Sequence, residues 1–309
     1  MSTTEKNEKG KLIPRKYMVT FILVTSLFAL WGFANDFTNP MVAAFRTVME
    51  LSNFKASLIQ FAFYGGYATM AIPAALFIRK YSYKSGILIG LALYATGALL
   101  AMPAAQQQSF TFFCFALYIL TFGLAFLETT ANPFILSLGA KENSTRRLNM
   151  AQAFNPVGSL TGMAVASLIV LPNLLSDERD AAGKLTFAAK DAAEKAGIRV
   201  HDLEAIRTPY IVIGLIVLAV FVIFLFKKMP KTESEELKAR GERRAVKATL
   251  SNLWHNRNYR FGVISQFFYV GAQIMCWTFI IQYAERLGIS WAKAQMFNIA
   301  AMSLNLTGR

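Results

Sequence analysis

Long apolar stretches constrain the fold of this chain more than any other feature of its sequence. A helix that crosses a membrane needs about 20 mostly apolar residues, and the chain contains seven such stretches and the start of an eighth. They cover approximately residues 17–45, 54–78, 85–104, 110–138, 148–171, 209–226, 261–284 and 291 to the end. In lipid, backbone polar groups must be satisfied internally, and a helix achieves this within one segment. The sequence therefore predicts an all-α, polytopic membrane protein.

The composition agrees with this prediction and argues against several other classes of protein. Hydrophobic residues make up 55% of the chain and charged residues 16%, well below the roughly 25% of a soluble domain. The net charge is +14, but no polar segment interleaves basic and aromatic residues, so no nucleic-acid partner is expected. Cys114 and Cys276 lie within apolar stretches and both histidines lie in loops. We therefore predict no metal site, no cofactor and no enzymatic activity.

The distribution of basic residues predicts how the chain is oriented in the membrane. Lys and Arg are frequent before the first stretch and after the second, fourth and sixth, with Arg146 and Arg147 following the fourth. The connections on the other side carry few basic residues or, in the long segment 172–208, a mixture of acids and bases. Because cytoplasmic loops are rich in Lys and Arg, we expect a multi-pass protein of the inner (plasma) membrane with a cytoplasmic N-terminus.

The order of these segments predicts four parts. Residues 1–16 form a cytoplasmic tail, 17–228 a six-helix bundle with an extracytoplasmic loop at 172–208, 229–260 a cytoplasmic linker, and 261–309 the start of a second bundle. This is the layout of a transporter built from two six-helix halves. The last predicted helix stops at Arg309 without a closing loop. We therefore expect a fragment with about seven and a half of twelve membrane helices, and one that does not transport by itself.

A short motif occurs twice within the first predicted bundle. Asn39-Pro40 lies in the first stretch and Asn132-Pro133 in the fourth, and each pair closely follows an acid. Gln60 and Gln152 recur at nearly the same separation in the stretches that come next. A separation of three helices reverses the direction in which the repeated helix crosses the bilayer. The pattern therefore indicates an inverted repeat of three plus three helices.

The two acids of this repeat, Asp36 and Glu128, are candidates for proton coupling. Of the 18 acids in the chain, they are the two that we predict to lie well inside membrane-spanning stretches. Such a position costs roughly 2.5–3.5 kcal/mol, and folding alone does not require it. Burial disfavours the charged form of a carboxyl, so the group can load a proton and release it when a cavity opens to alternate sides. The alternative is that each acid only ties helices together.

Several amides at similar depth suit a sugar as the transported molecule. Asn39, Asn132, Gln152 and Asn155 offer both donors and acceptors, which sugar hydroxyls require. The seventh stretch adds further amides and aromatic side chains that match the faces of a sugar ring. Each amide can alternatively serve only as packing glue between helices, and an aromatic side chain here can face lipid.

Six motifs resemble those of a known family. They are 31–35 (WGFAN), 60–67 (QFAFYGGY), 79–86 (RKYSYKSG), 127–134 (LETTANPF), 147–155 (RLNMAQAFN) and 269–273 (YVGAQ). Together they resemble the L-fucose–proton symporters, which belong to the fucose–galactose–glucose branch of the major facilitator superfamily. The resemblance runs from the first stretch to Arg309. It implies the major facilitator fold and a twelve-helix symporter that works by alternating access.

The resemblance also implies roles for individual residues. Glu128 is expected to link proton and sugar, while Gln152, Asn155 and Arg309 are expected to face the sugar cavity. The basic residues Arg79, Lys80 and Lys84 resemble a degenerate form of the superfamily's gating loop between its second and third helices. With the amides above, the predicted substrate-binding set is Asn35, Asn39, Asn132, Gln152, Asn155, Gln273, Trp277 and Arg309.

One departure from the family pattern concerns the first helix. The acid of the fucose permeases aligns with Asn39, whereas this chain has Asp36, one turn earlier on a similar face. We expect a monomeric carrier in the lipid bilayer that moves L-fucose, or a related hexose or 6-deoxyhexose, with a proton. A sodium-coupled glucose/galactose transporter and a non-transporting membrane sugar sensor remain as alternatives.

Overall fold

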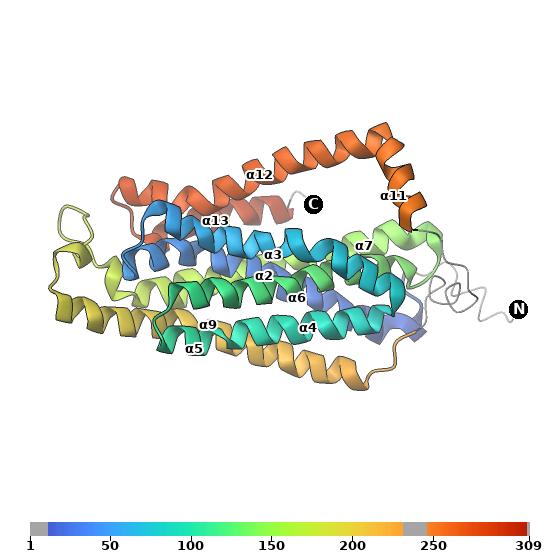
Figure 1. Ribbon diagram of the computed structural model, residues 1–309, viewed down its shortest axis with the longest axis horizontal. Helices are drawn as coiled ribbons and strands as arrows, with labels where there is room; N and C mark the ends of the chain where they lie inside the picture. Colours follow the sequence, from blue (N-terminus) through green and yellow to red (C-terminus); the bar gives the residue numbers. More distant parts are fainter. Residues whose placement is uncertain (1–11, 231–245, 308–309) are drawn as a thin grey trace, which may run out of the picture.

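The computed structural model describes residues 12–230 and 246–307, and within these ranges the chain is almost entirely helical (Figure 1). Seven helices in the described ranges are long and apolar enough to cross a membrane. They are Arg15–Val48, Asn53–Lys80, Tyr83–Gln106, Phe110–Ser137, Lys141–Asn173, Ala192–Phe226 and Arg257–Arg286. The predicted class of an all-α, multi-pass membrane protein is confirmed.

Within these spans the structure separates shorter helical elements. The first bundle contains α2 (Met18–Val48), α3 (Asn53–Lys80), α4 (Tyr83–Leu99), α5 (Ala101–Gln106), α6 (Phe110–Ser137), α7 (Ser144–Gln152), α8 (Phe154–Val165), the π-helical turn η3 (Ala166–Val170) and α9 (Ala192–Phe226). Serines at the N-caps explain where three of these helices begin, because the side chains of Ser52, Ser82 and Ser109 each accept a hydrogen bond from a backbone N–H of the first turn.

Small residues allow the helices of the first bundle to pack closely. Gly32 of α2 lies against the backbone of Asn155 in α8, and Gly158 of α8 lies against the backbone of Ala29 in α2. A Cβ atom at either glycine would collide with main-chain atoms of the neighbouring helix. Close approach through small residues is typical of helices that associate in a membrane. This contact fixes α8, which carries one of the predicted site amides, beside the helix of Asp36.

The sixth membrane helix differs from the prediction, since α9 begins at Ala192 and not near Pro209. Its first turn is capped by Asp191, whose side chain accepts a hydrogen bond from the backbone N–H of Glu194 at 2.8 Å. Ile198, Asp202, Leu203 and Ile206 are buried at helical spacing. The segment 172–208 is therefore only partly a loop. Its mixed charges suggested a loop, whereas the periodicity of its apolar residues indicates an amphipathic helix.

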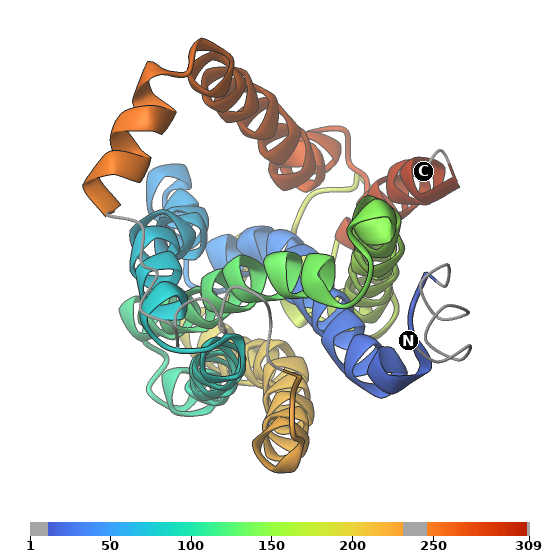
Figure 2. The same cartoon turned by 90° about the vertical axis from the view of Figure 1, so that its right-hand side faces the viewer.

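The last helices approach the first bundle at one end and leave it at the other. α11 (Val246–His255) is joined to α12 (Arg257–Arg286), which is followed by α13 (Trp291–Thr307). In Figures 1 and 2, α12 lies close to α2 where it meets α13 and diverges from the bundle toward α11. Ile281 and Ala284 at the close end are buried, whereas Phe267 and Phe268 in the diverging part are exposed. α2 begins at the end of the molecule where α12 stands apart from the bundle (Figure 1).

Candidate functional site

The first predicted acid is held in a chain of side-chain hydrogen bonds between α2 and α3. Asp36 is 3% exposed and Asn39 is 6% exposed. The Nδ2 group of Asn39 donates to the carboxylate Oδ1 of Asp36 at 3.5 Å, and Gln60 Nε2 donates to Asn39 Oδ1 at 3.0 Å. Asn39 therefore occupies the centre of a polar cluster made of Asp36, Asn39 and Gln60, and it links the acid to the neighbouring helix.

The second predicted acid lies beside a matching pair of amides on α6 and α7. Gln152 Nε2 donates to Asn132 Oδ1 at 3.2 Å, which repeats the Gln60–Asn39 hydrogen bond of the first cluster. Asn132 Nδ2 donates to the backbone oxygen of Glu128 at 3.0 Å. The carboxylate of Glu128 makes no hydrogen bond or ion pair with any residue that the structure describes. The shared Gln–Asn bond supports the inverted repeat predicted from the sequence.

A cavity with both polar and apolar side chains in its lining opens in front of Glu128. It has a volume of about 520 Å³ and lies between α3 and α6. Its lining consists of Tyr67, Ala68, Ala71, Ala125, Glu128, Thr129, Asn132 and Pro133. A carboxylate, an amide, a threonine hydroxyl and an aromatic ring thus surround a space large enough for a small polar molecule. Tyr67 lies in the motif 60–67 of the family resemblance, but nothing in the sequence singled it out as a cavity residue.

The remaining predicted amides lie on different helices. Asn35 of α2 has a buried Oδ1 atom without a hydrogen-bond partner in the described chain. Asn155 of α8 donates through Nδ2 to the backbone oxygen of Phe28 at 3.3 Å, so it helps to join α8 to α2. Gln273 is half-buried on α12, and Trp277 lies on the same helix. The side chain of Trp277, like Arg309 as a whole, lies outside what the structure describes.

The predicted gating residues lie at the end of the bundle where α2 begins (Figure 1). Arg79 and Lys80 are in the last turn of α3, and Lys84 is in the first turn of α4. Lys84 Nζ donates to the backbone oxygen of Leu225 at the end of α9, at 2.8 Å. A cation is favourable at a helix C-terminus, where backbone oxygens carry partial negative charge. This contact joins the connection between α3 and α4 to the last membrane helix of the bundle.

Two buried charged residues were missed by the sequence analysis. Arg147 was counted as a loop residue, but it is 0% exposed, and it donates to the backbone oxygens of Ile135, Leu136, Ala140 and Leu12. Asp202 was likewise counted among the mixed charges of the segment 172–208. Asp202 in α9 is fully buried and accepts hydrogen bonds from the backbone N–H groups of Leu175 and Ser176.

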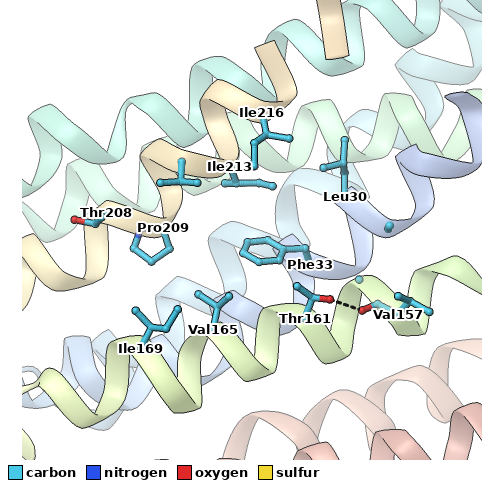
Figure 3. A pocket seen from close by; sticks show the side chains of 13 residues that line it. Leu30, Phe33, Val157, Thr161, Val165, Ile169, Thr208, Pro209, Ile213 and Ile216 are labelled. Atoms are coloured by element: carbon cyan, nitrogen blue, oxygen red, sulfur yellow. Dashed lines mark hydrogen bonds between the residues drawn. The ribbon is translucent and has the colours of Figure 1, made fainter. Parts of the chain in front are cut away.

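A second, apolar pocket of about 480 Å³ lies between α2, α8 with η3, and α9 (Figure 3). Side chains such as Leu30, Phe33, Ile169 and Ile213 form its walls. Its two polar side chains are already occupied within their own helices, since the hydroxyl of Thr161 donates to Val157 O and that of Thr208 donates to Glu204 O. The lining therefore suits hydrocarbon and offers little to a sugar.

Comparisons with known proteins agree with this architecture. Residues 19–308 match the sequence profile of the Major Facilitator Superfamily. The L-fucose-proton symporter of Haemophilus influenzae is 60% identical over 300 residues, which cover 97% of this chain and 69% of the relative. That of Escherichia coli is 38% identical over 271 residues, covering 87% of this chain and 60% of the relative. A glucose/galactose transporter of Brucella abortus is 29% identical over 269 residues, covering 87% of this chain and 59% of the relative.

Solved structures give the same result. The crystal structure of the E. coli fucose–proton symporter in the outward conformation has a TM-score of 0.75 and 34% sequence identity, and the match covers 95% of this chain and 70% of that one. A D-xylose-proton symporter, at 15% identity and a TM-score of 0.59, shares the fold. These relatives are transporters and not enzymes, in agreement with the sequence analysis. The chain spans about 60–70% of the length of the relatives described here.

Proposed function

Because the chain belongs to the Major Facilitator Superfamily, and within it to the family of the L-fucose–proton symporters, we propose that it carries L-fucose and a proton across the membrane together. The observation that supports this proposal most is the environment of Glu128. Its carboxylate lines a cavity of about 520 Å³ that also holds a tyrosine, a threonine and an asparagine. It has no partner in the described chain, while the neighbouring amides of Asn132 and Gln152 bond each other. An acid in such a place is free to exchange a proton with the cavity.

In this proposal, the surroundings of Glu128 and those of Asp36 have different tasks. Glu128 takes up a proton when its cavity opens to the outside and releases the proton when the cavity opens to the inside. Asn132, Gln152 and Asn155 offer donors and acceptors to the sugar hydroxyls. Asp36, on α2, has a smaller part in proton coupling. Further sugar-binding side chains come from α2, namely Asn35 and Asn39, and from the second half of the carrier, namely Gln273, Trp277 and Arg309.

The location and the orientation of the chain are also proposals. We place it in the inner membrane as a monomer, with the N-terminus and the segment between α9 and α12 in the cytoplasm, because these segments hold many of the basic residues. The connection between α3 and α4 then faces the cytoplasm. We assign a gating role to Arg79, Lys80 and Lys84, because they lie on this cytoplasmic connection, and the Lys84 contact with the end of α9 fixes the connection to the first half.

Proton-coupled uptake can be tested with the complete reading frame in proteoliposomes. Adding L-fucose should make the external medium more alkaline, because each sugar that enters removes a proton from outside. The Glu128→Gln variant should give no pH signal but should still exchange labelled L-fucose across the membrane. Glu142→Gln, which changes an exposed acid, is the matched control and should behave like the wild type. Uptake of glucose or galactose that requires sodium and leaves the pH unchanged would contradict the proposal.

A further inference from the structure

An ion pair joins the end of α2 to the end of α12. Nη2 of Arg46 donates to both carboxylate oxygens of Glu285, at 2.7 Å to Oε1 and 2.6 Å to Oε2. Nη1 of the same guanidinium donates to Oδ1 of Asn53 at 3.3 Å, which orients the arginine from α3. The two charged side chains are only 21% and 19% exposed. This is a well-formed charge pair between two segments that are 239 residues apart in sequence.

A second set of contacts continues from this pair to α13. The indole Nε1 of Trp291, which is fully buried, donates to Oε2 of Glu285 at 3.3 Å. The backbone N–H of Trp291 donates to Oδ2 of Asp177 at 3.1 Å, and Asp177 is itself paired with Arg179 at 2.8 Å. Trp291 therefore connects the acid of α12 to an acid in the connection before α9. We call Arg46, Glu285, Trp291 and Asp177 the clasp.

The position of the clasp indicates a role in conformational change as well as in local stability. It lies at the end where α12 approaches the first bundle, whereas α12 diverges from the bundle toward α11 (Figure 1). The proposed orientation places the clasp on the extracytoplasmic side. A carrier that alternates its access must separate its two halves on this side before a sugar can enter from outside. Arg46 and Glu285 belong to different halves, so their ion pair cannot survive that movement.

We infer that the Arg46–Glu285 pair is an extracytoplasmic gate that holds the carrier closed to the outside. Breaking the pair favours the outward-open state, because the charges are then hydrated separately while the closed state loses an ion pair that joins the two halves at this end. Trp291 and Asp177 support the gate by fixing the glutamate and the start of α13. The inference rests on the proposed function, because a gate requires a carrier with two access states.

The test uses a cysteine reporter that needs no sugar. Ala68 lines the cavity of Glu128, so Ala68→Cys, in a cysteine-free background of the complete reading frame, reports access to that cavity. A membrane-impermeant maleimide is added outside right-side-out vesicles. Glu285→Gln and Arg46→Gln should each raise the labelling rate roughly tenfold, the effect expected when a partly buried charge pair loses one charge. The charge-exchanged variant R46E/E285R should return the rate toward that of the wild type.

A matched control comes from an ion pair at the same end that lies within one half. Glu50 follows α2 and pairs with Lys195 and Arg199 of α9, so Glu50→Gln should leave the labelling rate unchanged. Unchanged labelling in Glu285→Gln, in protein that still elutes as a single folded species, would overturn the gate. So would L-fucose exchange that continues at the wild-type rate after R46C and E285C are joined by a short bifunctional thiol reagent.

The outcomes also separate the gate from the proposed substrate. If L-fucose is not transported but the labelling rates change as expected, the gate stands and the substrate assignment fails. If L-fucose is transported but neither charge substitution affects labelling or exchange, the substrate assignment stands and the gate is wrong.

Discussion

In α2, Asn39 donates to the carboxylate of Asp36, whereas in α6 Asn132 donates to the backbone oxygen of Glu128. Both asparagines precede a proline and both accept a hydrogen bond from a glutamine of the next membrane helix. The spacing of the two motifs also differs, since Asp36 is three residues before its asparagine and Glu128 is four residues before. The same motif thus restrains its acid in one half of the repeat and leaves it free in the other.

A repeated motif therefore need not carry a repeated task. A carboxylate that already accepts a hydrogen bond from an amide is stabilised in place and gains less from binding a proton. One that faces a cavity without a protein partner can change its protonation with the state of the cavity. The restrained acid is suited to joining α2 and α3, and the free acid is suited to coupling.

The largest effect should separate the two acids directly. Glu128→Gln should reduce L-fucose-driven proton movement by at least about 100-fold, because no other group in its cavity can replace the proton carrier. Asp36→Asn should reduce it by roughly tenfold or less, since the amide can keep the hydrogen-bond network of α2. Alkalinisation of the medium in proteoliposomes measures both. Equal losses in the two variants would show that the acids act as one coupled pair.

Arg147 and Lys55 occupy equivalent positions in the two parts of the repeat but differ in burial. Arg147 precedes Gln152 by five residues, and Lys55 precedes Gln60 by five residues, yet Arg147 is fully buried and Lys55 is exposed. Arg147→Met should lower stability by about 3 kcal/mol, because four backbone oxygens lose a charged donor. Lys55→Met should change it by less than about 0.5 kcal/mol. Thermal unfolding in detergent compares them, and equal effects would contradict a structural role for Arg147.

The two glutamines allow a finer test of the shared hydrogen bond. Gln152→Leu leaves the side-chain oxygen of Asn132, which lines the cavity, without its donor, whereas Gln60→Leu affects Asn39 away from that cavity. We expect L-fucose affinity to fall roughly tenfold in Gln152→Leu and by less than about threefold in Gln60→Leu. Binding can be followed by isothermal titration at constant pH. A larger loss in Gln60→Leu would place the sugar nearer to Asp36 than to Glu128.

The sequence predicted the membrane helices and the repeated motif, but not which oxygen atom each asparagine bonds. The lengths of the apolar stretches predict the membrane helices, and the Asn-Pro and Gln spacings predict the inverted repeat. Whether an asparagine donates to a carboxylate or to a backbone oxygen depends on side-chain rotamers, which the sequence does not express. Arg147 and Asp202 were missed for a related reason. A charged residue near a helix end reads as a loop residue unless its backbone partners, which come from other segments, are known.

The smallest expected effect concerns the outer end of α2, where Glu50 pairs with Lys195 and Arg199 of α9. The hydrogen bond from Lys195, with the nearby charges, lowers the pKa of Glu50 below its usual value. The pair therefore stabilises the fold above the pKa of an unfolded glutamate and loses this contribution as the pH falls through the lower pKa of the folded state. Because Glu50 is largely exposed, Glu50→Gln should cost at most about 0.5 kcal/mol at pH 7, and the difference from the wild type should vanish in acid. Melting temperatures at neutral and acidic pH measure this. A cost that persists in acid would mean that Glu50 stabilises the fold through packing and not through its charge. The outer end of α2 would then be stabilised by buried contacts, as the Arg147 site is.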